Sequence, residues 1–239
     1  LSAQTTAMLR RSGIHRVHHI PPGVDLDRCS PAPFSAGYAQ LDAGDGPFLL
    51  FAGHHDERGG LEAALDVLAR IRRGRPDVRL LTAMRHRPGE DRQALRRRLH
   101  ALADDRGVRG AVVELGAMAN MRAAILASHA VLFQPARLGL KMDLPLTLVE
   151  ALAFGRPVIV SPVETLPEMG EEPAVIAGRP HDGRVLDHLC ALLEDSALFD
   201  RASRAARATA VERYDARQMV ARYNDLYREA AASRSAVPA

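Results

Sequence analysis

Glu150 is the side chain whose surroundings point most directly to binding chemistry. It stands inside the run LTLVEALAF (146–154), where nearly every neighbour is apolar and a helix would be largely buried. A carboxylate withdrawn from water is costly unless it is paired. Glu150 therefore caps a backbone group, pairs with an arginine, or accepts hydrogen bonds from ligand hydroxyls. Thr147, one turn earlier on nearly the same face, could meet the same ligand.

The start of that helix is a candidate anion site. The first amides of a helix have no intrahelical acceptor and the helix dipole is positive there, so the N–H groups of residues 146–148 could cradle a diphosphate. Pro145 suits the first helical position because it has no N–H. Lys141 and Arg137 stand just before it and could neutralise phosphate charge. An ordinary helix start with solvated cations is the alternative.

The glycine-rich segment GHHDERGG (53–60) lies between an apolar run and a stretch of helical periodicity. Gly53, Gly59 and Gly60 permit close backbone approach, and Arg58 could reach a phosphate. The segment matches neither the GxGxxG fingerprint of dinucleotide sites nor the Walker loop. It is a second candidate for phosphate contact.

The sequence offers no metal-ligand spacing. The histidine pairs at 18–19 and 54–55 are adjacent residues, which point to opposite sides of an extended chain, and no carboxylate or cysteine shares a helical spacing with them. Cys29 and Cys190 have no partner at a redox or ligand spacing. We expect no metal, no cofactor and a reducing, cytoplasmic setting.

Apolar runs of strand length alternate with helical periodicity, which is typical of parallel βαβ units. This pattern predicts an α/β fold with a doubly wound, Rossmann-like parallel sheet, whose ligands bind beyond the carboxyl ends of its strands. Strands are expected at 48–52, 78–84, 111–115, 129–135, 157–161 and 174–177, and helices at 60–73, up to 103, after a capping Asn120, at 145–154 and within 182–231.

Composition sets the domain organisation. The 239 residues are 47% hydrophobic, and the longest apolar stretches fall far short of the ~20 residues of a membrane span. Five prolines and four glycines in 21–47 predict an interdomain linker at 21–46. Residues 1–20 would be the last helix and strand of a preceding domain cut away by truncation, 47–231 the ligand-binding domain, and 232–239 a frayed tail. The arginine run at 85–98 lacks interleaved aromatics, which favours a solvated helix face over nucleic acid or membrane.

Four segments, in order and at the right spacing, resemble the retaining glycosyltransferases of family 4, the group 1 transferases of GT-B fold. IPPGVDLDRCSP (20–31) resembles the family's "IPNGVD…F.P" stretch, and FAGHHDERGG (51–60) its "GR…KG" loop. VVELGAMANMRAAILASHAVLFQPA (112–136) resembles "LG…m..lla.advlv.PS". DLPLTLVEALAFGRPVIVSPVETLPE (143–168) resembles "GFGL..lEAMA.G.PVI.s…..E". The likeness covers about residues 1–170 and implies one half of a GT-B fold, the carboxy-terminal half.

The resemblance implies residue roles. Arg58 and Lys141 would contact the donor diphosphate with the amides of 146–147, Glu150 would hold the ribose hydroxyls, and 116–118 would lie near the base. The predicted donor-binding set is Gly53, His54, Arg58, Gly116, Met118, Lys141, Leu146, Thr147 and Glu150, and the predicted catalytic residues are Asp143 and Lys141.

Two positions depart from the family pattern. Met142 stands where the family has its first glutamate, eight positions before Glu150, although Asp143 offers a carboxylate next door. His54 stands where an arginine is expected. These departures concern the contact with the transferred sugar more than nucleotide binding.

The resemblance implies transfer of a hexosyl group from a nucleoside diphosphate sugar to a saccharide, lipid or small-molecule acceptor. No metal is needed if cations and helix amides offset the charge of the leaving diphosphate. The missing amino-terminal domain would supply the acceptor side, so the chain alone is expected to bind donor without turnover. Two alternatives stay open: a degenerate, non-catalytic nucleotide-binding module, and an epimerase of the same fold using acids such as Asp143 and Glu168. No nucleic acid partner is expected, and contact with the inner face of the membrane stays open.

Overall fold

The computed structural model describes residues 2–41, 43–54, 59–84, 89–115, 120–138 and 144–235. Within them the strands are β1 (Phe48–Gly53), β2 (Arg79–Met84), β3 (Val112–Glu114), β4 (Ser128–Phe133), β5 (Val158–Val160) and β6 (Val175–Ala177). The helices are α1 (Ala3–Arg11), α2 (Phe34–Tyr38), α3 (Leu61–Ile71), α4 (Arg92–Asp104), α5 (Met121–Ala127), α6 (Leu146–Ala153), α7 (Gly183–Glu194), α8 (Ser196–Arg213) and α9 (Ala216–Ser235), with short 3₁₀ turns η1 (Arg109–Ala111) and η2 (Leu166–Met169).

The six predicted strands form one sheet in the order β3-β2-β1-β4-β5-β6. Every pairing is parallel, with Leu50 opposite Leu81 on one side and Val131 on the other. The predicted doubly wound α/β fold is confirmed. The strand order reverses between β1 and β4, and in such sheets the carboxyl ends of these two strands open onto a ligand crevice.

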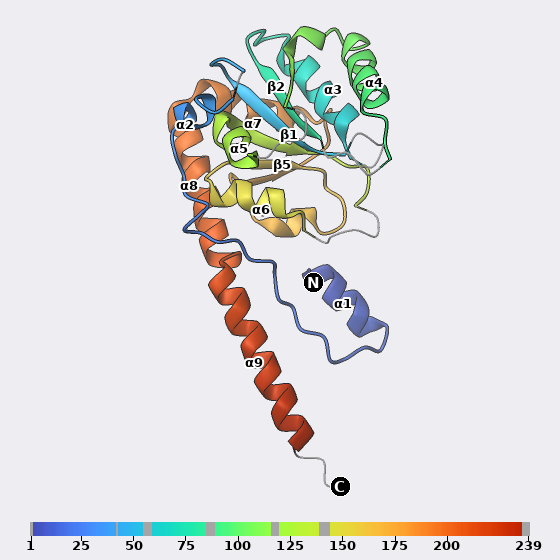
Figure 1. Ribbon diagram of the computed structural model, residues 1–239, viewed down its shortest axis with the longest axis vertical. Helices are drawn as coiled ribbons and strands as arrows, with labels where there is room; N and C mark the ends of the chain where they lie inside the picture. Colours follow the sequence, from blue (N-terminus) through green and yellow to red (C-terminus); the bar gives the residue numbers. More distant parts are fainter. Residues whose placement is uncertain are drawn as a thin grey trace.

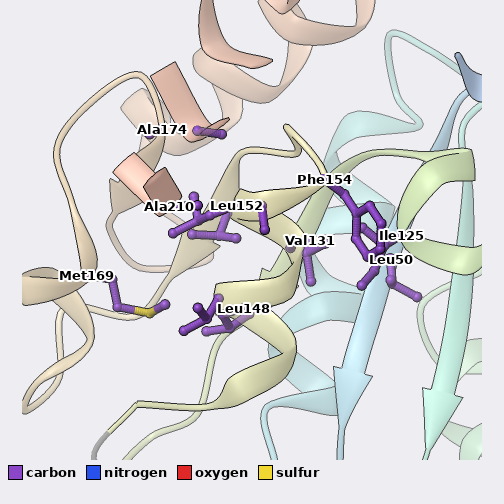
Figure 2. Packing of buried hydrophobic residues seen from close by; sticks show 14 of the residues in the cluster. Leu50, Ile125, Val131, Leu148, Leu152, Phe154, Met169, Ala174 and Ala210 are labelled. Atoms are coloured by element: carbon purple, nitrogen blue, oxygen red, sulfur yellow. The ribbon is translucent and has the colours of Figure 1, made fainter. Parts of the chain in front are cut away.

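Alternating side chains divide the core between the two faces of the sheet. Leu49 and Phe51 of β1 point to the side covered by α3 and α7, whereas Leu50 points to the side covered by α5, α6 and α8. On this second side Leu148 and Leu152 of α6 pack beside Val131, Met169 and Ala210 (Figure 2). Helix α6 is therefore held rigidly against the sheet, with its first turn at the carboxyl edge.

Helix α1 lies apart from the sheet and is joined to it by an extended stretch of chain (Figure 1). Residues 14–23 form no regular structure, so the strand expected within 1–20 is wrong. A strand needs a neighbouring strand to accept and donate its backbone hydrogen bonds. The amino end of α1 is instead held by Glu168, whose carboxylate accepts from the amides of Ala3 at 2.9 Å and Gln4 at 3.0 Å.

The segment expected as a linker packs along the domain. Val24 and Leu26 are buried, and Val24 forms a parallel bridge with Asp215 at the start of α9. Helix α2 packs on α5 so closely that a Cβ at Gly37 would lie 2.4 Å from the amide nitrogen of Ala127. This stretch contributes to the core of the domain that follows it.

Arg156 anchors the same segment from inside. Its side chain is buried, and one guanidinium nitrogen donates to the carbonyls of Ala32 at 2.9 Å and Leu126 at 2.8 Å. The guanidinium also lies over the rings of Phe34, at 4.8 Å, and Phe199, at 5.5 Å. Burial lowers the pKa of Arg156 to about 10, so the group stays charged at neutral pH.

Helix α9 projects away from the rest of the molecule (Figure 1). Its large apolar side chains are exposed, with Val220 at 50%, Tyr223 at 40% and Tyr227 at 67%. The helix extends to Ser235, into the expected tail. Among the residues described, no helix is long and apolar enough to cross a membrane.

His129 on β4 should make the fold sensitive to acid. Its ring stacks on Phe34 at 4.3 Å, and burial, followed by the charge of Arg156, lowers its pKa from 6.5 to about 4. Between pH 6.5 and 4 the imidazole of His129 therefore binds a proton in the unfolded chain but not in the folded chain. The free energy of unfolding is highest above pH 6.5 and falls as the pH falls toward 4. After a discount for residual solvent contact, we expect a loss of about 2 kcal/mol.

Urea unfolding at a series of pH values measures this loss. His129→Phe keeps a stacking ring without a titrating nitrogen, so its stability should be flatter across this window. Parallel pH curves for the two proteins would contradict the assignment to His129.

Candidate functional site

The loops after β1, β4, β5 and β6 meet at the carboxyl edge of the sheet and enclose a cleft of about 520 Å³. We call it the α3 cleft, because the first turn of α3 forms one wall. Its lining residues are 60–63, 134–136, 161–163 and 179–181. The cleft lies where the strand order reverses, which is the place that a doubly wound sheet offers to ligands.

The glycines after β1 allow this loop to pack against its surroundings. A Cβ at Gly60 would lie 2.5 Å from the carbonyl carbon of Gln134, and one at Gly59 would lie 1.7 Å from the carbonyl oxygen of His54. Gly60 also has a left-handed backbone, with φ of +82°. The close approach expected here is therefore made to the protein's own backbone, which fixes the start of α3 against the end of β4.

Gly60→Ala should destabilise the protein by about 3 kcal/mol, of which roughly 1 kcal/mol is the left-handed backbone and the rest is displacement of the Gln134 backbone. Gly107→Ala is the matched control, because Gly107 has φ of +66° and open space around its Cβ position. Denaturant unfolding of both variants separates the cost of the left-handed backbone from the cost of displacing the Gln134 backbone. Equal destabilisation by both substitutions would show that the contact with Gln134 is unimportant.

Helix α6 begins at the same edge. Pro145 is its N-cap, with φ of −66° and ψ of 123°, so the prediction that it occupies the first helical position is wrong. Its extended ψ lies outside the helix while its carbonyl accepts from the amide of Leu148 at 3.0 Å. Leu148 is thus engaged within the helix. The amides of Leu146 and Thr147 stand at the two positions that have no intrahelical acceptor.

Glu150 is half-buried in the second turn of α6. Burial raises the pKa of its carboxyl group above the usual value. Neither a hydrogen bond nor an ion pair joins this carboxylate to any described residue, so the structural pairings considered from the sequence are not found in this part of the chain. The carboxylate is left for a group outside the described residues, such as a ligand.

Glu164 connects two loops of this edge. Its backbone has φ of +47°, a left-handed conformation unusual for a residue other than glycine. Its carboxylate accepts from the amide of Leu138 at 3.1 Å. The loop after β5 thereby holds the loop after β4, which leads into α6. Sequence reasoning missed Glu164, Gln134 and Arg179 as residues of this edge; a polar residue closing the apolar run HAVLFQP was the one available signal, and it concerns Gln134.

Several predicted site residues lie outside the described residues, namely Arg58, Gly116, Met118, Lys141 and Asp143. The structure places Gly53 and His54 at the end of β1, and Leu146, Thr147 and Glu150 in the first turns of α6. In a doubly wound sheet the loops after β1 and β4, between which the strand order reverses, border one crevice. The residues after β1 and those at the start of α6 therefore belong to one edge of the sheet.

Arg96, Arg97 and Arg98 of α4 are each paired with a carboxylate. Arg96 lies 3.3 Å from Glu114, and Arg98 lies 3.6 Å from Glu62. These pairs favour the solvated helix face expected for the arginine run. Within the described ranges, no three histidine, cysteine, aspartate or glutamate side chains come together as metal ligands would.

Comparison with known proteins gives the family. The sequence pattern of "Glycosyl transferases group 1" matches residues 46–195. A phosphatidyl-myo-inositol mannosyltransferase of Mycobacterium leprae is 32% identical over 221 residues, which are 91% of this chain and 55% of that protein. The chain therefore spans about half the length of such curated relatives.

Solved structures share the fold. The Anabaena protein HepE in complex with UDP superposes with a TM-score of 0.82 at 18% identity, covering 95% of this chain and 62% of that one. The carboxy-terminal domain of a group 1 glycosyl transferase from Francisella tularensis superposes with a TM-score of 0.67 at 16% identity, covering 81% of this chain and 99% of that one. With a family match over more than half of its length, this chain belongs to the group 1 glycosyl transferases.

Proposed function

We propose that this chain is the donor-binding half of a retaining glycosyltransferase, which moves a hexosyl group from a nucleoside diphosphate sugar to an acceptor. The observation that carries the proposal is the start of α6, where the half-buried carboxylate of Glu150 follows the amides of Leu146 and Thr147 at the crevice. A carboxylate suits ribose hydroxyls, and helix-start amides suit a diphosphate.

The donor would lie across the strand reversal. In this proposal Glu150 accepts hydrogen bonds from the ribose, the amides of 146–147 donate to the diphosphate, and Arg58 and Lys141 neutralise its charge. Asp143 and Lys141 would act nearest the transferred sugar. HepE, whose fold this chain shares, was solved in complex with UDP, which supports a nucleotide ligand for this chain. Since cations and amides offset the leaving charge, the reaction would need no metal.

The acceptor side would come from outside the half of its curated relatives' length that this chain spans. The apolar stripe of Val220, Tyr223 and Tyr227 on α9 is exposed and supports such a partner, because a contiguous exposed apolar patch marks an interaction surface. Since the mannosyltransferase relative is named for phosphatidyl-myo-inositol, a lipid is the first acceptor to test, and peripheral contact with a membrane would follow from it.

The epimerase alternative loses one of its candidate acids. Both oxygens of the Glu168 carboxylate accept backbone amides of α1, so this group is engaged in holding a helix rather than free to exchange a proton. The degenerate-module alternative allows nucleotide binding but predicts no transfer, so an activity assay of the full-length protein separates it from the proposal.

Calorimetric titration of the purified chain with UDP, GDP, ADP and their sugars tests the proposal. We expect saturable binding of one nucleotide with a dissociation constant on the order of 10 μM. A folded chain that binds none of them would contradict the donor-binding role. Following the anomeric configuration of the product made by the full-length protein, by NMR, then tests transfer with retention.

A further inference from the structure

Gln134 is a buried polar side chain that the proposed donor site does not use. It is 2% exposed, and neither its amide oxygen nor its amide nitrogen has a hydrogen-bond partner among the described residues. Ala130 and Leu132 of β4 pack on the α3 side of the sheet, and the alternation of the strand continues to that side at Gln134. The residue lines the α3 cleft. An unpaired buried amide is costly, which points to a ligand that completes it.

The surroundings of Gln134 favour an anion. Helix α3 is 11 residues long, and the amides of residues 61–63 lie in its first turn, where the dipole is positive. The backbone of Gln134 touches the cap of this helix at Gly60. Arg179 also lines the cleft and forms no ion pair with any described residue. Glu62, the carboxylate of the first turn, is already offset by Arg98 and Arg106, each at 3.6 Å.

We propose that the α3 cleft binds a phosphate group that carries a hydroxyl. The amides of α3 and the guanidinium of Arg179 would neutralise the phosphate oxygens, and the nitrogen of Gln134 would donate to one of them. The amide oxygen of Gln134 can only accept, so it requires a donor hydrogen on the ligand, which in a phosphate or polyol phosphate is an O–H. This requirement separates a protonated phosphate or a polyol phosphate from sulfate, which has no proton at neutral pH. The phosphate could belong to the sugar donor or to a second molecule.

Titration of the whole chain with inorganic phosphate and with sulfate, at pH 7 and equal ionic strength, tests the site without any nucleotide. We expect phosphate to bind about fivefold more tightly than sulfate because one hydrogen bond is added. Gln134→Met has a similar length and no polar atoms, so it should abolish the preference while keeping the fold. Arg179→Ala should weaken both anions about fivefold. Arg201→Ala, which removes an exposed charge on α8, is the matched control and should change neither.

Absence of phosphate saturation in the folded chain, or the same phosphate preference in Gln134→Met, would overturn the proposal whatever the nucleotide titrations show. Repeating the titration with saturating nucleoside diphosphate assigns the source. Persistent phosphate binding indicates a second phosphorylated molecule, and competition indicates that the donor's own phosphate occupies the cleft.

Discussion

Glu150→Ala is expected to weaken binding of the preferred nucleoside diphosphate about a hundredfold, which corresponds to about 2.8 kcal/mol. Hydrogen bonds to a charged group contribute about 1.5–3 kcal/mol each, and this carboxylate has no described partner that would compete with the ribose. Calorimetric titration of wild type and variant measures the change. Glu212→Ala, which removes an exposed carboxylate from α8, should bind as wild type does.

Loss of the Glu150 charge should leave the fold at least as stable, although it weakens nucleotide binding. Because burial raises the pKa of Glu150, the charged carboxylate opposes folding, and its cost falls as the pH falls. Glu150→Gln should therefore melt at or above the wild-type temperature while binding nucleotide more weakly, a trade seen where a site is kept for function. Unchanged affinity in both variants would remove Glu150 from the donor site.

Arg156→Ala is expected to lower the free energy of unfolding by about 4 kcal/mol. The substitution leaves the carbonyls of Ala32 and Leu126 without their donor and empties the space over Phe34. These carbonyls belong to the segment before β1 and to the last turn of α5, so one side chain joins distant parts of the chain. Urea unfolding at pH 7 gives the difference.

Arg156→Met separates packing from hydrogen bonding. Methionine refills the volume without donors, so we expect about half of the loss to remain. If methionine restored the wild-type stability, the carbonyl contacts would be of no net value and the charge would be a burden to the fold. Nucleotide affinity should be unchanged in any folded Arg156 variant, because the residue follows the far end of α6 from the crevice.

The sheet could be predicted because apolar runs of strand length are a local signal. The cap at Asn120, whose side chain accepts from the amide of Ala123 at 3.2 Å, was equally readable from residue type and position. Pro145 was predicted at the first helical position but is the N-cap, because a proline at either position has nearly the same φ and differs only in ψ.

The missed features depend on tertiary contacts. Nothing local distinguishes Arg156 from the many solvated arginines of this chain. Its burial depends on carbonyls and aromatic rings from distant parts of the chain, which meet only in the folded protein. The left-handed backbone of Glu164 and the isolated amide of Gln134 likewise depend on loops that meet only after the sheet has formed. The family resemblance named the residues of the α6 edge, and five of the predicted site residues lie where the structure gives no description.

The contact between Glu168 and the first amides of α1 has a mechanical consequence. Glu168 follows β5 in the same loop as Glu164, which in turn holds the loop before α6. A displacement of α1 therefore acts, through Glu168 and Glu164, on the loop before α6 at the carboxyl edge of the sheet. Any hinge motion that displaces α1 has to strain or break these hydrogen bonds. The position of α1 and the shape of the crevice would therefore change together.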